Sequence, residues 1–173
     1  ATHHALEDYG VLSSLPGFQI FVPAFKDDVA AIVDSLLETP RPSYLRLGRC
    51  ELGEGARFRY SPWRKLLDGD KGLMIAVGPL AGSLYHAVAE KPPAARPELW
   101  VACELPIGEL PPELIASAQN CPSLSIVEEH VAHTGFAAQI SLALATNGVA
   151  SSIQSFSAQH YPSKTYGSQP FHR

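Results

Sequence analysis

Apolar and polar residues follow two rhythms along the first part of the chain. Apolar residues recur every three or four positions over 26–38, which is the spacing of an amphipathic helix, and a shorter stretch of the same kind covers 6–12. Short apolar runs at 18–22 and 43–47 are typical of buried strands. This order of helix, strand, helix and strand predicts a parallel sheet.

A second alternating series follows a stretch that is rich in glycine and proline. Residues 51–71 include Gly53, Gly55, Pro62 and Gly69 among scattered charges, and they predict a linker. Beyond it, apolar runs predict further strands, and longer segments between the runs predict helices. The predicted strands cover 73–77, 99–103, 124–127 and 152–156, and the predicted helices cover 80–89, 112–118 and 136–146.

These patterns together predict an α/β protein built from two units. The first unit covers 1–50, the linker covers 51–71 and the second unit covers 72–173. The strands of the second unit are apolar runs and do not alternate with polar residues, which favours a mostly parallel sheet with helices on both faces.

Composition and charge narrow the possible functions. The 173 residues are 46% hydrophobic and 17% charged, which is typical of a globular protein. Thirteen Lys and Arg against seventeen Asp and Glu give a formal charge of −4, so there is no basic excess for binding nucleic acid. No apolar run approaches the roughly 20 residues of a membrane-spanning helix, and no signal-peptide pattern opens the chain. We therefore expect a soluble, cytoplasmic protein that binds neither nucleic acid nor membrane.

The cysteines do not indicate a disulfide framework. Cys50, Cys103 and Cys121 are odd in number and widely spaced, which fits neither paired disulfides nor a cysteine zinc site. Free cysteines are among the most buried residues in proteins. The sequence therefore predicts reduced and mostly buried thiols.

Four basic residues of the first unit are candidates for binding an anion. His3 and His4 stand before the first predicted helix, where a histidine could act as an acid or base. Arg46 and Arg49 stand at the carboxyl end of a predicted parallel strand, which is where open α/β sheets place ligand-binding groups. Arginine suits carboxylates and phosphates because its planar fork donates in pairs. For Arg46, the favoured interpretation is a surface ion pair.

A second polar cluster follows a predicted strand of the second unit. Glu128, Glu129 and His130 are followed by His133, and Gly135 precedes a predicted helix. The spacing of the two histidines suggests a metal site, but no third ligand accompanies them, so an ion-paired turn between strand and helix is the favoured interpretation. Phosphate-loop, dinucleotide-binding and serine-hydrolase motifs are absent from the sequence.

Several stretches occur in an order and spacing that is typical of one enzyme family. They are 2–8, 15–18, 22–24, 42–49, 126–130 with the glycine at 135, and 166–169. In this ordered set the chain resembles the transketolase family. The resemblance covers nearly the whole chain and implies a partial three-layer α/β/α pyrimidine-binding domain followed by a mostly parallel α/β/α C-terminal domain.

The resemblance also implies a reaction and two site residues. Members of the family use thiamine diphosphate and a divalent metal such as Mg²⁺ to move two-carbon ketol units between sugar phosphates. On this basis His3 is expected to contact the substrate and to take part in catalysis. Arg49 is expected to bind the phosphate of a sugar phosphate, and the resemblance implies nothing for His4.

The resemblance further implies that the chain needs a partner. In the family, the cofactor lies between two protomers, and the diphosphate and metal motif, the catalytic glutamate and the aromatic residues around the pyrimidine ring would all lie upstream of Ala1. We therefore expect the cofactor and metal to be bound mainly by regions outside this chain, in a diphosphate-binding domain or subunit of the same enzyme. The chain is then expected to be a fragment, or the C-terminal subunit of a split transketolase, within a homodimer or heterotetramer.

Three alternatives remain open at this point. A deoxyxylulose-phosphate synthase and the β-type chain of a 2-oxo acid dehydrogenase share the same superfamily, but the Tyr-Leu-Arg-Leu-Gly-Arg stretch at 44–49 and the Thr-His-His run at 2–4 favour a transketolase. A third alternative is a non-catalytic assembly module that has kept the fold.

Overall fold

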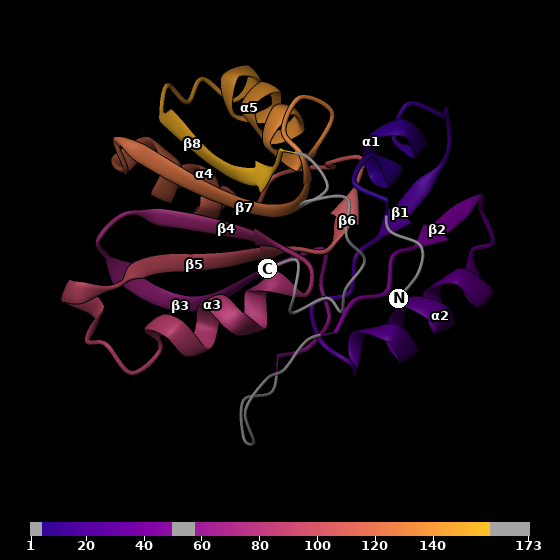
Figure 1. The fold of residues 1–173 in the computed structure, drawn as a ribbon, viewed down its shortest axis with the longest axis horizontal. Helices are drawn as coiled ribbons and strands as arrows, with labels where there is room; N and C mark the ends of the chain where they lie inside the picture. Colours follow the sequence, from indigo (N-terminus) through magenta and orange to yellow (C-terminus); the bar gives the residue numbers. More distant parts are fainter. Residues whose placement is uncertain (1–4, 50–57, 160–173) are drawn as a thin grey trace.

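The computed structural model describes residues 5–49 and 58–159, and Figure 1 shows their arrangement. The first unit contains helix α1 (Asp8–Leu12), strand β1 (Gln19–Phe21), helix α2 (Asp28–Glu38) and strand β2 (Ser43–Leu45). Strands β1 and β2 are parallel, with Ile20 opposite Tyr44. The alternation of helix and strand that the sequence predicts here is confirmed.

The second unit is built on a five-stranded sheet. The strands stand in the order β3-β5-β4-β7-β8, and all are parallel except β3, which runs antiparallel to β5 at one edge. The predicted α/β class and the mostly parallel sheet are therefore confirmed. The elements are β3 (Trp63–Asp70), β4 (Leu73–Val77), α3 (Leu80–Val88), the short 3₁₀ helix η1 (Pro93–Ala95), β5 (Pro97–Ala102), β6 (Glu104–Leu105), α4 (Pro112–Asn120), β7 (Ser123–Val131), α5 (Phe136–Thr146) and β8 (Ser152–Ala158).

Alternate residues of β4 point to opposite faces of this sheet and bury different helices. Ile75 packs in a cluster with Leu114 of α4 and Ile140 of α5, whereas Ala76 packs with Ala81 of α3. Helices α4 and α5 thus cover one face and α3 covers the other, as Figure 1 shows. This sandwich explains why the strands read as uninterrupted apolar runs.

The predicted linker over 51–71 is wrong for its second half. Residues 63–70 form β3, while 51–57 lie outside the described residues. Burial alternates along β3 because it is an antiparallel edge strand, and one of its buried positions is held by a charged residue, Arg64. A charged buried position breaks the apolar pattern by which a strand is usually predicted.

The two units also share a sheet and a core. Strand β6 directly follows β5 and pairs antiparallel with β1, so a piece of the second unit completes the three-stranded sheet β2-β1-β6 of the first. Strand β6 is only two residues long, which is too short to give a recognisable pattern in the sequence. The predicted division into two units at 71/72 therefore does not include the pairing of β6 with β1. Tyr9 and Ile20 of the first unit lie in one hydrophobic cluster with Phe136 of the second.

The described cysteines carry no disulfide. Cys103 is buried and free, and Cys121 is free and half-buried, while Cys50 lies outside the described residues. Burial raises the pKa of the Cys103 thiol to about 11, although the Arg64 guanidinium opposes that rise. The Cys103 thiol therefore stays protonated at neutral pH and is a poor nucleophile.

Among residues 5–49 and 58–159, none of the helices is both long enough and apolar enough to cross a membrane.

Candidate functional site

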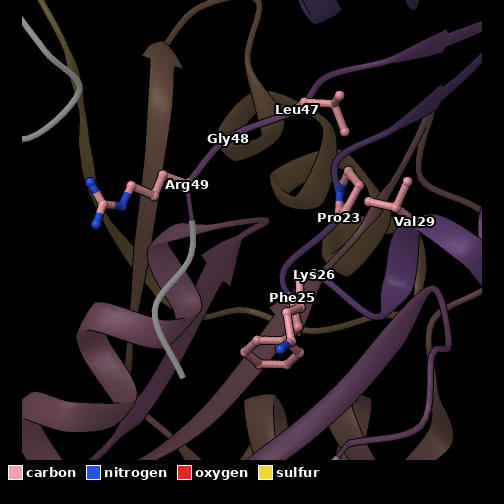
Figure 2. A pocket seen from close by; sticks show the side chains of 7 residues that line it. All are labelled: Pro23, Phe25, Lys26, Val29, Leu47, Gly48 and Arg49. Carbon is pink, nitrogen blue, oxygen red and sulfur yellow. The ribbon is translucent and has the colours of Figure 1, made fainter. Parts of the chain in front are cut away.

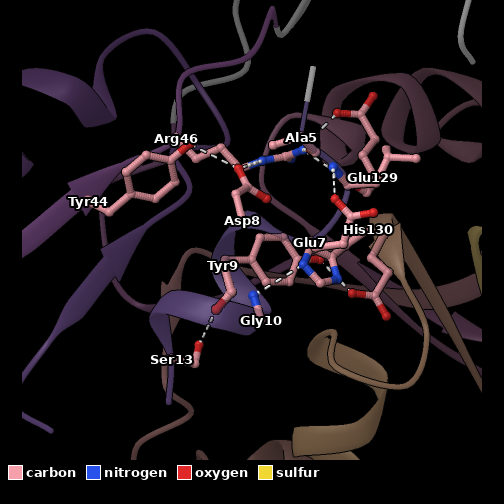
Figure 3. Close-up of polar contacts among 12 residues, drawn as sticks. Ala5, Glu7, Asp8, Tyr9, Gly10, Ser13, Tyr44, Arg46, Glu129 and His130 are labelled. Atoms are coloured by element: carbon pink, nitrogen blue, oxygen red, sulfur yellow. Dashed lines mark hydrogen bonds and ion pairs between the residues drawn. The ribbon is translucent and has the colours of Figure 1, made fainter. Parts of the chain in front are cut away.

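Residues 5–10, called segment 5–10 below, contact two parts of the chain that are distant in the sequence. This short segment contains the start of α1, and it contacts both the residue that follows β2 and the end of β7, as Figure 3 shows. The contacts are polar, and most of them are partly or fully buried. These contacts hold segment 5–10 in place.

Arg46 connects the first segment to both units. Its Nε donates to Asp8 Oδ2 at 2.8 Å, and its Nη2 donates to the carbonyl oxygens of Ala5 at 3.3 Å and Glu129 at 3.1 Å. The Tyr44 hydroxyl donates to the same Asp8 oxygen at 2.9 Å. The interpretation of Arg46 as an ion-pair residue is confirmed, because Asp8 and, at 3.9 Å, Glu129 supply the carboxylates.

Glu128 is a buried carboxylate whose two oxygens are both occupied. Oε2 accepts from the Phe136 backbone N–H at 2.7 Å and from the Tyr9 hydroxyl at 2.5 Å, and Oε1 accepts from the Ala137 N–H at 3.0 Å. The carboxylate thus lies at the positive N-terminal end of α5. A side chain at Gly135 would collide with Glu128 Oε2 and with the Val131 carbonyl oxygen, which explains a glycine there.

Tyr9 connects Glu128 to His130. Burial and then the neighbouring Glu128 carboxylate raise the pKa of the Tyr9 hydroxyl well above its ordinary value near 10. The hydroxyl therefore keeps its proton and donates a hydrogen bond to Glu128. The Tyr9 ring stacks on the His130 ring, with 3.8 Å between centroids and 19° between planes.

His130 is fully buried and uses both ring nitrogens within the fold. Its Nδ1 lies 2.9 Å from the Val131 carbonyl oxygen, and its Nε2 lies 3.1 Å from the Gly10 backbone nitrogen. A carbonyl can only accept and a backbone N–H can only donate, so Nδ1 carries the proton and Nε2 is the acceptor. The neutral tautomer is thereby fixed, and neither nitrogen is left for a metal ion.

The ion-paired turn predicted after a strand at 124–127 needs a correction, because Glu128, Glu129 and His130 lie within β7. Glu129 does face Arg46, but Glu128 and His130 are held by hydrogen bonds to backbone N–H groups and to Tyr9. Buried groups of this kind are more often satisfied by backbone than by opposite charges. Sequence reasoning missed Tyr9 and Gly10 as their partners, since 119 and 120 residues separate them from these contacts.

Arg49 lies at a separate hollow at the surface. The hollow has a volume of about 230 Å³ and combines an apolar floor with two cations, Lys26 and Arg49, both exposed. Its described lining residues include no acid and are Pro23, Phe25, Lys26, Val29, Leu47, Gly48 and Arg49. Figure 2 shows the Arg49 side chain at the rim, extending away from Pro23 and Leu47.

A buried ion pair fixes one wall of this hollow. Asp28 Oδ2 accepts from the backbone N–H groups of Ala24 at 2.9 Å and Phe25 at 3.0 Å. The two Asp28 oxygens also receive a paired contact from Arg64, at 2.8 and 2.6 Å. Arg64 Nη2 lies 3.0 Å from Cys103 Sγ, and its guanidinium lies 4.9 Å from the centre of the Phe25 ring. Sequence reasoning missed this pair because Arg64 falls in the predicted linker.

The predicted site residues have different outcomes. Arg49 is described and lines the hollow, whereas His3 and His4 lie outside the described residues. In the sequence, His3 stands two positions before Ala5, the first residue of segment 5–10. Substrate contact by His3 and by Arg49 stays a prediction.

The described residues do not fit a metal–diphosphate centre. Among them, no group of three or more His, Cys, Asp or Glu lies close enough to hold a metal ion. The buried carboxylates Asp28 and Glu128 are already bound by Arg64 and by the start of α5.

Comparison with curated proteins gives two relatives of the same description. The chain is 34% identical over 92 residues to the B subunit of apulose-4-phosphate transketolase from Phocaeicola vulgatus, which covers 50% of this chain and 28% of that protein. It is 27% identical over 153 residues to the protein of the same name from Actinobacillus succinogenes, which covers 86% of this chain and 49% of that protein.

The chain is similar in sequence to transketolase B subunits. It spans at most about half the length of these two relatives, at 28% and 49%. No protein-family model matches the sequence.

Solved structures show the same transketolase-like fold. A split-gene transketolase described as an inactive β4 tetramer matches with a TM-score of 0.73 and 23% identity, over 94% of this chain and 55% of that one. Transketolase from Leishmania mexicana matches with a TM-score of 0.55 and 19% identity, over 76% of this chain and 21% of that one. A transketolase variant from Pichia stipitis in complex with fructose 6-phosphate matches with a TM-score of 0.57 and 16% identity, over 92% of this chain and 23% of that one.

Proposed function

We propose that this chain is the C-terminal subunit, or a piece of it, of a two-component transketolase. With its partner it transfers two-carbon ketol units between sugar phosphates. The observation that carries the proposal is the similarity to two transketolase B subunits, one of them along 86% of the chain. Both relatives are named for a phosphorylated sugar, which supports a phosphorylated ketose as the substrate class.

The chain contributes substrate-binding groups in this proposal. Arg49 follows the carboxyl end of β2 and lines a hollow that is also lined by Lys26, so a phosphate bound there would lie beside two cations. His3 is assigned to the reacting end of the substrate, as the family resemblance implies. Thiamine diphosphate and its divalent metal are assigned to the diphosphate-binding partner, because the described carboxylates have other roles.

The proposal includes assembly into a homodimer or heterotetramer. One neighbour of known structure is described as an inactive tetramer of β chains, which supports a requirement for a second kind of subunit. Helix α2 and the residues after β2 expose large apolar side chains, among them Leu37 at 75% and Leu47 at 66%. Such side chains on neighbouring elements are a suitable surface for a partner.

Arg49 provides a test of the substrate class. Replacing Arg49 with Ala in the assembled enzyme is expected to raise KM for a phosphorylated ketose by roughly ten- to a hundredfold, since a charged hydrogen bond contributes about 1.5–3 kcal/mol. The change in kcat should be smaller, because the phosphate is remote from the reacting carbonyl. Steady-state kinetics with fructose 6-phosphate as donor would measure both constants.

Two further variants make this test specific. Arg49→Lys should recover only part of the KM, since lysine is a point charge without the paired donors. Arg59→Ala removes another exposed arginine and should leave both constants unchanged. An unchanged KM in Arg49→Ala would show that Arg49 does not bind the substrate phosphate.

A further inference from the structure

Segment 5–10, which follows His3 and His4 in the sequence, is held by buried polar groups of the second unit. Helix α1 is only five residues long, and isolated helices of that length are unstable in water. Its position therefore depends on tertiary contacts. Two of these contacts come from Glu128 and His130, more than a hundred residues further along the chain.

These contacts fix the segment in several independent ways. The Tyr9 side chain is held by the hydrogen bond to Glu128 and by stacking on His130, and the Gly10 backbone is held by His130 Nε2. The Leu6 carbonyl oxygen accepts from the Val131 N–H at 3.0 Å. A side chain at Gly10 would lie 2.8 Å from His130 Cε1 and 2.6 Å from the Thr134 carbonyl oxygen, so the two segments are in close contact.

Glu128 and His130 are unusual choices if packing were their only role. Both are almost completely buried, at 3% and 0% exposure, and burying a polar group costs free energy unless all of its hydrogen bonds are made. Apolar side chains of similar size would fill the space. Unlike apolar side chains, the Glu128 carboxylate and the His130 imidazole accept directional hydrogen bonds from segment 5–10, and Glu128 also accepts them from the start of α5.

We infer that Tyr9, Glu128 and His130 are positioning residues that hold segment 5–10, which follows His3 and His4 in the sequence, in place in the assembled enzyme. This inference rests on the proposed function, because it supposes that His3 contacts the substrate. It gives the C-terminal unit a part in the reaction although none of these three side chains need touch the substrate. Small displacements of a catalytic group are costly, since reacting atoms must be placed closely.

Two substitutions of His130 separate positioning from packing. His130→Phe keeps an aromatic ring for stacking on Tyr9 but leaves the Gly10 N–H without an acceptor, whereas His130→Gln supplies an acceptor again. In the reconstituted complex of the full chain and its partner, His130→Phe is expected to lower kcat about tenfold or more, with KM for fructose 6-phosphate changed less than about threefold. His130→Gln should lie between the wild type and His130→Phe.

Amide hydrogen exchange supplies a readout that does not depend on activity. His130→Phe should speed exchange of the Gly10 amide by about tenfold or more, while amides of β4 remain unchanged. His133→Phe is the matched control, because it makes the same substitution at an exposed histidine three positions later, and it should alter neither exchange nor kcat. If His130→Phe does not fold, Tyr9→Phe, which removes only the hydroxyl bound to Glu128, should show the same two effects.

The outcomes distinguish the inference from the function on which it rests. An inactive wild-type complex would refute the proposed function. An active wild type, together with a variant that exchanges faster at Gly10 but keeps its kcat, would overturn the positioning role alone. A fall in kcat that follows the exchange rates from wild type through Gln to Phe would support it.

Discussion

Replacing Asp28 with Ala is expected to lower the free energy of unfolding by about 3–5 kcal/mol, because the Arg64 guanidinium would remain buried without its partner. Asp28 is 1% exposed and Arg64 is 7% exposed, and the two groups share paired contacts of 2.8 and 2.6 Å. The substitution also removes the acceptor of two backbone N–H groups. Urea unfolding followed by circular dichroism would measure the loss.

Two companion variants identify the cause of that loss. Asp34→Ala removes an exposed carboxylate from the same helix and should change stability by less than about 0.5 kcal/mol. The double variant Asp28→Ala with Arg64→Met removes both charges and should regain about half of the loss, since an uncharged side chain carries no desolvation penalty. If the double variant were as unstable as the single one, unpaired charge would not be the cause.

Replacing Gly78 with Ala is expected to destabilise the fold by about 2–5 kcal/mol, from a strained backbone and from overpacking together. Gly78 has a φ of +54°, and an added Cβ would collide with Val22 Cγ1 and lie 3.0 Å from the Val22 carbonyl oxygen. Gly78 follows β4 and Val22 follows β1, so this contact joins the two sheets. Thermal unfolding would report the change.

Gly148 offers a control with the same kind of backbone. Its φ is +72°, but nothing lies within 4 Å of an added Cβ, so Gly148→Ala should cost only about 1–2 kcal/mol for the left-handed conformation. The difference between the two variants measures the collision with Val22. Adding Val22→Ala to Gly78→Ala should remove part of the loss. Equal losses at Gly78 and Gly148 would contradict a close contact between the sheets.

The fold was predictable from the sequence where burial is two-sided and apolar. Strand β4 at 73–77 and helix α5 at 136–146 agree with the predicted bounds, because continuous apolar runs and helical spacing mark them. Strand β3 was missed because Arg64 occupies one of its buried positions, and a strand stabilised by a buried ion pair does not read as apolar. Strand β6 was missed because only its pairing with β1 defines it.

The candidate site was predictable only in part, for a related reason. The family resemblance indicated His3 and Arg49, and position at a strand end indicated Arg49 independently. The partners of Glu128 and His130 could not be predicted, because hydrogen bonds over 119 and 120 residues leave no periodic trace in the sequence. Tyr9 resembles any core aromatic until its hydroxyl is placed against a carboxylate.

Binding of thiamine diphosphate tests most directly whether this chain supplies one part of a shared active site. The measurement is isothermal titration calorimetry with thiamine diphosphate and Mg²⁺, on the full chain alone and on the chain mixed with its diphosphate-binding partner. We predict negligible binding by the chain alone and saturable binding by the mixture, because the described residues hold no metal centre of their own. Micromolar binding by the isolated chain, or no binding by the mixture, would contradict the proposal.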